Sequence, residues 1–294
     1  MAIDITYKLS DAAEKVEGAL AGIFDSMKCD SPELVEAMRY STLSGGKRIR
    51  AFLTLSFSKM FGGSDEKALP SACAVEMIHA YSLIHDDLPA MDDSPLRRGV
   101  PSCHIKFGEA TALLAGDALL TRAFSVLAEN DKITDRSARL SAGVLSRLAA
   151  EGGMCGGQAI DLSDSVSSEE DLVRLYYLKT GALIEAACLL GYYSATDSPS
   201  PEVEEDIKTY ARSLGVAFQI HDDILDVTGD AAVLGKPTGA DERNDKKTIL
   251  AFEDMAAAEK LEYDLTLAAV AAVTDYADSD GPCQLATWLM TRKK

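Results

Sequence analysis

The chain contains nearly the same acidic phrase twice, each time at the end of an apolar run. The first is Ile84-His85-Asp86-Asp87-Leu88 and the second is Ile220-His221-Asp222-Asp223-Ile224. Because the apolar residues that precede them belong in a core, we expect each carboxylate cluster to lie at the end of a buried helix. Ionised carboxylates held close together repel one another and cost free energy unless a cation neutralises them. The two phrases therefore predict helices that end in cation-binding sites.

The rest of the chain has helical periodicity and few signs of strands. Apolar residues recur every three or four positions in most segments, which is typical of amphipathic helices. Ser31-Pro32 and Ser200-Pro201 each place a Ser at a helix cap and a Pro at the first helical position. We predict one all-α domain, residues 1–294, with about ten helices. Their expected positions are near 9–28, 33–41, 47–61, 66–90, 108–128, 135–155, 168–192, 201–227, 252–273 and 281–291.

The charge balance argues against several classes of partner. The chain has 29 Lys and Arg against 47 Asp and Glu, a formal net charge of −18. Such a charge disfavours binding to nucleic acid or to an anionic membrane surface. We expect no apolar stretch to reach the length of a membrane span, and the start lacks the features of a secretory signal. The six cysteines form no CxxC pair, which suits a reducing compartment, so we predict a cytoplasmic protein.

The spacing of the aspartates indicates how each cluster meets a cation. Asp222 and Asp226 are four apart and share one helix face. Asp86 and Asp92 are six apart and do not align on a regular helix, but Pro89 ends or kinks a helix, so that the chain can turn Asp92 back. Mg²⁺ joins one or two carboxylates to substrate phosphates. We hypothesise that the two clusters face one another and hold several Mg²⁺ ions around a diphosphate; the alternative is a solvated acidic helix end.

Basic residues stand where an anionic substrate would need them. Gly45-Gly46-Lys47-Arg48-Ile49-Arg50 occupies an expected helix start, a ready anion site, although its spacing is not that of a P-loop. Arg97-Arg98 follows the first acidic cluster, where guanidinium groups can grip phosphate oxygens. His79 lies two turns before Asp86 on the same face, so it is either a hydrogen-bonded core histidine or a ligand-binding one.

Taken together, the motifs resemble those of the short-chain trans-polyprenyl diphosphate synthases, with the closest likeness to bacterial farnesyl-forming members. The matching motifs run from about Leu43 to Thr248 and comprise residues 45–50, 79–87, 92–99, 153–161, 179–181 and 218–226. The resemblance implies an isoprenoid synthase fold: a bundle of about ten core helices around a deep central cavity, usually a homodimer. It also implies head-to-tail condensation of isopentenyl diphosphate with an allylic diphosphate.

The resemblance further implies a role for individual residues. Metal ligands would be Asp86, Asp92 and Asp222, holding three Mg²⁺ ions, with Mn²⁺ possible instead. Residues implied in catalysis are Asp86, Asp87, Asp92, Lys179, Thr180, Gln219, Asp222, Asp223 and Asp226. Residues implied in binding isopentenyl diphosphate are Gly46, Lys47, Arg50, His79 and Arg98. Those implied in binding the allylic diphosphate are Arg97, Lys179, Lys236 and Lys246.

Product length depends on the helix before the first cluster. Ser82 lies one turn before Asp86 on the same face, whereas Tyr81 is turned aside in an ideal helix. We predict that Tyr81 and Ser82 form the floor of the cavity; the resemblance favours Tyr81 as the aromatic stop, and thus a C15 product, with C20 as the alternative. Rival interpretations are a terpene cyclase, a catalytically silent partner subunit and an acidic cation-binding scaffold. The second acidic cluster and the basic residues 47–50 favour condensation.

Overall fold

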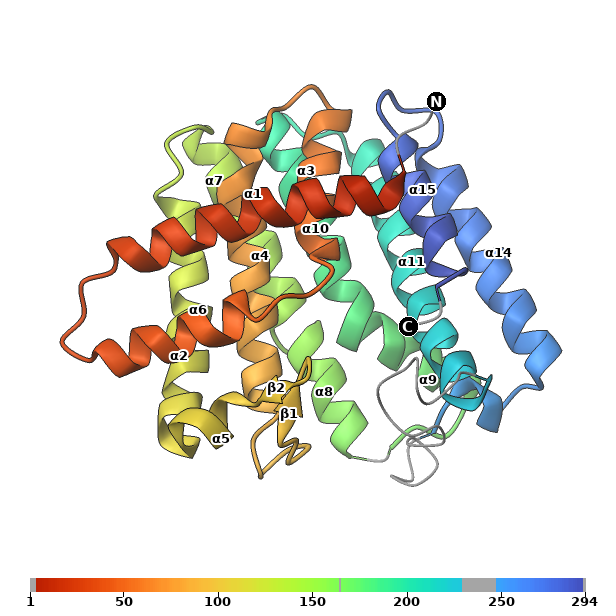
Figure 1. Cartoon of the computed structure of the whole chain (residues 1–294). Helices are drawn as coiled ribbons and strands as arrows, with labels where there is room; N and C mark the ends of the chain where they lie inside the picture. The colour runs from red at the N-terminus through yellow and green to blue at the C-terminus, as the bar shows by residue number, and fades with distance from the viewer. Residues whose placement is uncertain (1–3, 164, 229–246, 293–294) are drawn as a thin grey trace. The chain divides into compact units, whose positions relative to one another are not determined.

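A computed structural model describes residues 4–163, 165–228 and 247–292, and it confirms the all-α prediction (Figure 1). The long helices are α1 (Ile5–Ser26), α2 (Pro32–Leu43), α3 (Ile49–Met60), α4 (Asp65–Asp86), α6 (Glu109–Ala128), α7 (Asp135–Ala149), α10 (Ala182–Ala195), α11 (Pro201–Thr228), α14 (Met255–Val273) and α15 (Asp280–Leu289). Shorter helical segments are α5 (Cys103–Phe107), α8 (Met154–Leu162), α9 (Glu169–Tyr176), the π-helical η1 (Tyr177–Gly181) and the 3₁₀ turn η2 (Ile249–Ala251). In the described ranges the only strands are β1 (Leu96–Arg97) and β2 (Val100–Pro101), an antiparallel pair.

The chain divides into two compact units. One comprises Met1–Leu145 with Leu190–Ser198, and the other comprises Ser146–Leu189 with Pro199–Lys294. The expected single domain over residues 1–294 stays a prediction.

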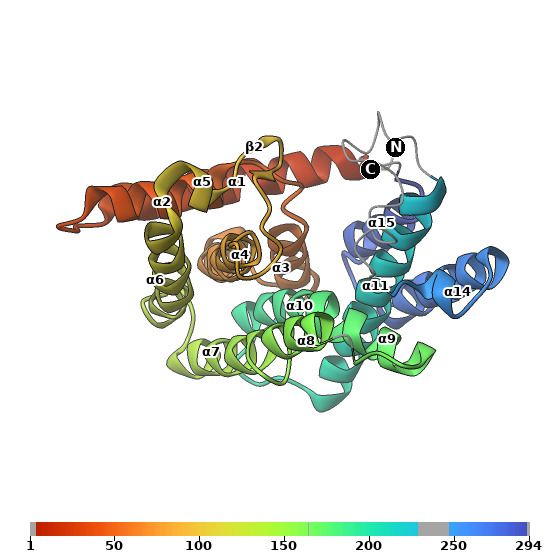
Figure 2. The same cartoon turned by 90° about the horizontal axis from the view of Figure 1, so that it is seen from below.

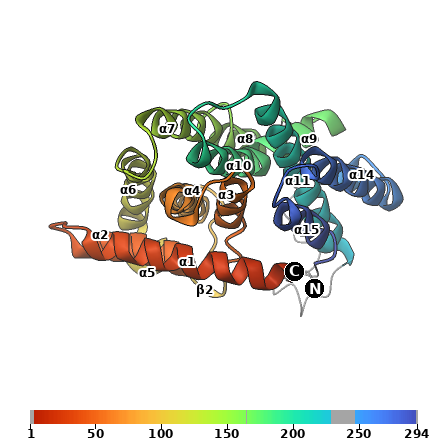
Figure 3. The same cartoon turned by 90° about the horizontal axis from the view of Figure 1, so that it is seen from above.

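The first unit is built around α4. This helix is apolar on nearly every side, with Cys73, Val75, Met77 and Ile78 inaccessible to solvent, as expected of a helix with neighbours all round. Seen along its axis, α4 has α3 and α6 on opposite flanks, while α1 and α2 run along one side (Figures 2 and 3). The first acidic phrase thus lies at the end of a buried helix, as predicted.

Helix α6 bears on the question of a membrane span. Among the described residues it is the one helix that is long and apolar enough to cross a membrane, contrary to the expectation that no stretch reaches that length. It packs against α4, α2 and α5. Since packed core helices of soluble proteins have the same composition, α6 is weak support for a span.

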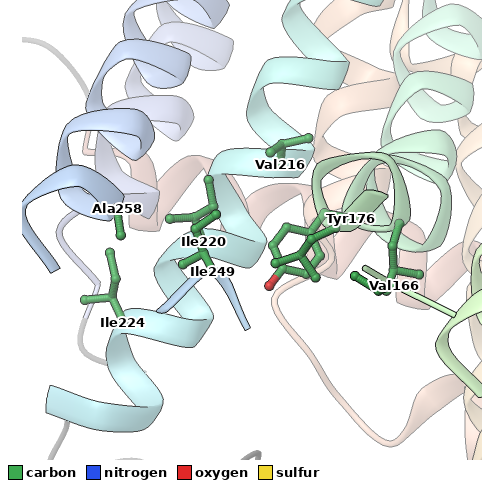
Figure 4. Close-up of a cluster of buried hydrophobic side chains, with 9 residues drawn as sticks. Val166, Tyr176, Val216, Ile220, Ile224, Ile249 and Ala258 are labelled. Atoms are coloured by element: carbon green, nitrogen blue, oxygen red, sulfur yellow. The ribbon is translucent and has the colours of Figure 1, made fainter. Parts of the chain in front are cut away.

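The second unit is built around α11 and α14. Val216, Ile220 and Ile224 recur every fourth residue of α11 and pack with Ile249 and Ala258 (Figure 4). The same cluster contains Tyr176 and Leu172 of α9, so that one apolar core fixes both helices. Because the second acidic phrase lies among these isoleucines, the core also fixes the direction of its aspartates.

Several helix boundaries differ from the prediction. The expected helix 66–90 ends at Asp86, and the expected helix 135–155 ends at Ala149. A separate helix, α8, follows, and most of it lies between the expected helices 135–155 and 168–192. The expected helix 168–192 is interrupted by the π-helical turn η1. Gly153 explains one break, because a Cβ there would lie 2.0 Å from the Leu148 carbonyl oxygen.

Close helix packing at glycine pairs predicts an effect on stability. A Cβ on Gly215 would lie 2.4 Å from the Gly181 Cα, whereas one on Gly22 in α1 would meet nothing within 4 Å. We expect Gly215→Ala to lower the free energy of unfolding by about 1–3 kcal/mol because α11 and η1 must separate. Gly22→Ala should raise it by up to about 1 kcal/mol, since alanine favours a helix. Urea unfolding, monitored by circular dichroism, would measure both changes. Equal stability of Gly215→Ala and wild type would show that the close contact between α11 and η1 does not contribute to stability.

Candidate active site

The chain folds back on itself directly after α4. The Asp92 amide donates to the Asp86 carbonyl oxygen at 2.9 Å, and the Ser94 amide donates to the Asp87 carbonyl oxygen at 3.1 Å. Asp93 turns the backbone with a positive φ of 47°. The tight turn that contains Pro89 therefore returns Asp92 to the helix end, as the sequence predicted. The carboxylates of Asp86 and Asp92 belong to one short segment.

The buried carboxylate of Asp87 forms an ion pair with the partly exposed Arg97 beside this segment. The Asp87 side chain is 3% exposed, and Arg97 Nε lies 3.1 and 3.2 Å from its two oxygens. Burial lowers the pKa of Arg97, but the hydrogen bond and charge of Asp87, followed by the charges of Asp86 and Asp92, outweigh burial and raise it. Arg97 is thus a guanidinium held among three carboxylates. In the structure Asp87 supports Arg97, and its suggested support of a metal stays a prediction.

His79 of α4 is surrounded by a cluster of arginine side chains. The pKa of His79 is lowered well below its usual value, first by burial and then by the charges of Arg50, Arg98, Arg48 and Arg97. A neutral imidazole among four guanidinium groups marks a place where several negative charges would be stabilised. Three of the residues predicted to bind isopentenyl diphosphate, Arg50, His79 and Arg98, therefore lie together.

The glycine loop before α3 fits closely against this cluster. Arg98 donates a hydrogen bond to the Gly45 carbonyl oxygen. A Cβ on Gly46 would lie 2.8 Å from the Arg98 guanidinium carbon, and Gly46 has a φ of 121°, which only glycine adopts readily. Gly46 therefore allows the loop to touch Arg98. Lys47 follows on the same loop and its side chain is exposed.

The second aspartate cluster lies on one continuous helix, α11. Asp222 and Asp226 are one turn apart on that helix, as predicted, and Asp226 is 3% exposed. Asp223 is buried; it accepts hydrogen bonds from the Tyr176 hydroxyl and, at 2.8 Å, from the Ile249 amide. Asp223 therefore ties α9 and η2 to α11, and its suggested role near a metal stays a prediction.

The carboxyl-terminal Arg292 contacts this cluster. Its guanidinium pairs with Asp222 and lies 4.0 Å from the Phe218 ring. His221 binds the Arg292 carbonyl oxygen at 3.0 Å and Glu262 at 2.8 Å. Burial lowers the pKa of His221, but the contacts with the Glu262 carboxylate and the Arg292 carbonyl oxygen, both of which accept, together outweigh burial and raise it.

Lys179 and Thr180 lie in the π-helical turn η1. Lys179 pairs with Asp161 of α8 at 2.5 Å, and the Thr180 hydroxyl donates to Gln219 of α11 at 2.9 Å. A Cβ on Gly157 would lie 2.4 Å from the Lys179 amide nitrogen, so this glycine lets α8 approach η1. Close packing at Gly157 therefore holds α8 against the backbone of Lys179.

Of the remaining predicted residues, two lie on α4 and two lie outside the part of the chain that the structure describes. Tyr81 is buried and makes an edge contact with the His85 ring, with centroids 5.7 Å apart. The Ser82 hydroxyl donates to the His79 carbonyl oxygen at 2.9 Å. Lys236 and Lys246, predicted to bind the allylic diphosphate, lie outside the described residues.

The donor atoms suit Mg²⁺ that is shared with a substrate. Within residues 4–163, 165–228 and 247–292, no three Asp, Glu, His or Cys side chains gather closely enough to hold a metal ion unaided. Each cluster offers two neighbouring aspartates: Asp86 and Asp92, joined by a backbone hydrogen bond, and Asp222 and Asp226, one turn apart on α11. Mg²⁺ is commonly bound by one or two carboxylates, with waters and substrate phosphates completing its shell. The residues present therefore fit this ion.

Sequence reasoning missed most of the residues that orient the site. Glu76 and Glu262 had no place in the prediction. Asp161 entered it only as the end of the 153–161 motif, and Arg292 only as a residue that could help close the site, without its partner Asp222. For Glu76 a signal existed, since it is an acidic residue in the middle of an apolar helix, three positions before His79. A buried carboxylate of this kind needs a partner.

Comparison with known proteins identifies the class to which the fold and the site belong. The chain is 45% identical to the farnesyl diphosphate synthase of Escherichia coli over 267 residues, which is 90% of this chain and 89% of that protein. It is 44% identical to a geranylgeranyl diphosphate synthase of Cyanophora paradoxa over 225 residues, 74% of each chain. A crystal structure of a FPP/GFPP synthase from Zymomonas mobilis matches with a TM-score of 0.87 and 32% identity, covering 99% of this chain and 100% of that one.

These likenesses define an all-α prenyltransferase, a transferase with an isoprenoid synthase fold. The family model for polyprenyl synthetase matches residues 31–277, and the chain belongs to this family.

The crowding of positive charge around His79 predicts a pH effect on stability. The pKa of His79 is lower in the folded chain than in the unfolded chain. As pH falls below about 6.5, the imidazole of the unfolded chain therefore binds a proton while that of the folded chain stays neutral. Stability should therefore fall on acidification, by up to ~1.4 kcal/mol per pH unit from this group. His79→Gln removes this contribution, so its stability should fall less steeply than that of wild type between pH 7 and pH 5. Denaturant unfolding at several pH values measures the two slopes; identical slopes would contradict the assignment.

Proposed function

We propose that this chain condenses isopentenyl diphosphate head-to-tail with an allylic diphosphate, dimethylallyl or geranyl, and releases farnesyl diphosphate. The relatives that bear that name support the C15 product. The observation that carries the proposal is the arrangement on α4, where a cationic cluster around His79 lies two turns from the aspartates of the helix end. One helix thus carries a binding site for one diphosphate and, two turns away, a binding site for the cations that accompany a second diphosphate.

The basic residues of the first unit would bind isopentenyl diphosphate. Gly46, Lys47, Arg50, His79 and Arg98 would surround its two phosphates. His79 is held neutral and would donate a hydrogen bond, while the guanidinium groups supply the charge. Because those groups already repel one another, a bound diphosphate would relieve the repulsion and not merely replace water.

The aspartates would hold Mg²⁺ on the allylic diphosphate. We assign Asp86, Asp92 and Asp222 as ligands, with three ions expected and Mn²⁺ as the alternative. Bound Mg²⁺ would stabilise the charge that develops on the departing diphosphate. Arg97 would add a further positive charge at the helix end, where Asp87 fixes its direction.

The π-helical turn would border the allylic carbons. Lys179, with Lys236 and Lys246, would bind the allylic diphosphate. Thr180 and Gln219 are hydrogen-bonded to each other, so their oxygens are oriented before a cation forms. No side-chain base is needed in this scheme, because the released diphosphate can accept the final proton.

We also propose a cytosolic homodimer. Its support is the surface of α6, where Leu114 is about half exposed and borders the same pocket as the apolar residues Leu34 and Met38 of α2. Exposed apolar patches on soluble proteins mark association sites. All six cysteines are free thiols; Cys29 and Cys155 are exposed, which suits a reducing compartment.

The reaction is tested by product length with defined starters. Purified protein is incubated with isopentenyl diphosphate, Mg²⁺ and, separately, dimethylallyl, geranyl or farnesyl diphosphate. We expect products to stop at C15 and farnesyl diphosphate not to be extended, as measured by chromatography of the dephosphorylated alcohols. Extension to C20 would support the geranylgeranyl alternative, which the Cyanophora relative favours. A folded protein without condensation from any starter would support the silent-subunit alternative.

A substitution at the predicted floor of the cavity tests the length assignment. Tyr81→Ala removes a buried ring from α4, and we expect products of C20 or longer because the growing chain would gain room. Ser82→Ala tests the other predicted floor residue; because it removes only a hydroxyl that bonds back to its own helix, we expect little change in product length from it. A product distribution of Tyr81→Ala identical to that of wild type would show that Tyr81 does not set the length.

A further inference from the structure

We propose that Glu76 and Arg48 are positioning residues: their buried ion pair holds the glycine loop and the first turn of α3 in the conformation that binds isopentenyl diphosphate. This inference rests on the proposed function of the cluster around His79. Neither residue is assigned to the substrate; both would act through Lys47, Arg50 and His79.

The loop needs support because its backbone is unusual. Gly45 and Gly46 have φ values of 84° and 121°, and Arg48 has a φ of 49°. Glycine adopts such values at little cost, but arginine does not. Arg48 is nevertheless the cap of α3, and its carbonyl oxygen accepts the Phe52 amide at 2.9 Å. The surrounding contacts must therefore favour this conformation.

The Arg48 side chain makes those contacts. It is 2% exposed, and its Nη1 lies 3.2 Å from Glu76 Oε2. Its Nη2 donates to the Thr42 carbonyl oxygen at 2.7 Å, and its Nε lies 3.1 Å from Glu17 Oε1. The guanidinium thus joins the end of α2, helix α1 and helix α4 to the loop residue that starts α3.

Glu76 binds both the side chain and the backbone of this segment. Its side chain is also 2% exposed, and while Oε2 accepts from Arg48, Oε1 accepts the Ala51 amide at 3.2 Å. That amide is one of the donors that a helix start leaves without an intrahelical partner. Arg50 lies between the two attachment points, so its direction is fixed by them. Glu76 is one turn before His79 on α4, so the same helix carries the imidazole and the carboxylate that binds the Arg48 guanidinium.

Glu76 is also the buried negative charge of the cationic cluster. Burial lowers the pKa values of Arg50 and Arg98, and the charge of Glu76 opposes that change in both. Without this carboxylate the guanidinium groups would repel one another more strongly and move apart. A buried ion pair is weak support for stability in general, and its best-attested use is to specify one conformation. At this loop the specified conformation is the one that places Lys47 and Arg50.

The test separates binding of the two substrates. Glu76→Gln keeps the shape of the side chain and an acceptor for Ala51 but removes the charge; Arg48→Lys keeps the charge but loses the planar fork. We expect each to raise KM for isopentenyl diphosphate by about 10- to 100-fold, as displaced binding groups do. KM for geranyl diphosphate and kcat at saturating isopentenyl diphosphate should change less than threefold.

Glu17→Gln is the matched control. Glu17 also pairs with Arg48, but its side chain is 39% exposed, and it is Glu76 that accepts the Ala51 amide at the start of α3. We expect KM within a factor of two of wild type. The double variant Glu76→Gln/Arg48→Lys should raise KM no more than the worse single variant, because residues that act as one unit are not additive. Thermal unfolding of all four variants identifies any that are not folded. If either Glu76→Gln or Arg48→Lys fails to fold, the KM of the other single variant tests the positioning role.

The outcomes are distinct. A wild-type KM for isopentenyl diphosphate in a folded Glu76→Gln or Arg48→Lys protein would overturn the positioning role while leaving the proposed reaction intact. Equal increases in both KM values, or a loss of stability without a change in KM, would also overturn it, since a merely structural pair would act in that way. Absence of condensation in the wild-type protein would overturn the proposed function itself.

Discussion

The pairing of a carboxylate with a cationic side chain, buried in full for Glu76 with Arg48 and in part for the others, is the interaction on which the candidate site residues of each unit depend. Asp87 with Arg97, Glu76 with Arg48 and Asp161 with Lys179 each join a carboxylate to a cationic side chain at or near the site. An isolated buried charge would be expensive, whereas a paired one is tolerable and strongly directional. The pairs leave side chains oriented before any substrate arrives. Such preorganisation is the main means by which a protein without a side-chain nucleophile stabilises separated charge.

Backbone geometry supplies the second requirement, close approach. In the second unit Gly157 lets α8 touch the backbone of Lys179, and Gly181 meets Gly215 of α11. The π-helical turn η1 adds a residue to its helix at this place and carries both Lys179 and Thr180. Single π turns are often found at functional sites, where the irregular backbone redirects a side chain. In the first unit Gly46 has the same purpose for Arg98. These glycines are therefore part of the site although no glycine carries its chemistry.

Local rules predicted much of this arrangement. The four-residue spacing of Asp222 and Asp226 placed them on one face, and α11 is a continuous helix through both. Pro89 predicted that the chain would leave the helix and return Asp92 to Asp86, which the hydrogen bond between their backbones confirms. The same rules failed at the interruptions of helices, near Gly153 and at η1, because a helical pattern of apolar residues continues through both. Periodicity reports which face is buried and does not report a break in the hydrogen-bond ladder.

The sequence by itself determined the helical class, the position of both acidic phrases at the ends of buried segments, and the chemistry of the candidate ligands. These follow from neighbours in the chain, whose spacing is set by the helix repeat. Only the tertiary structure decided which charges pair: that Asp87 holds Arg97, that Glu76 holds both Arg48 and the first turn of α3, and that Arg292 reaches Asp222. Such partners are 10 to 70 residues apart, beyond the reach of the helix repeat. Their choice depends on how whole helices pack, and no local pattern encodes it.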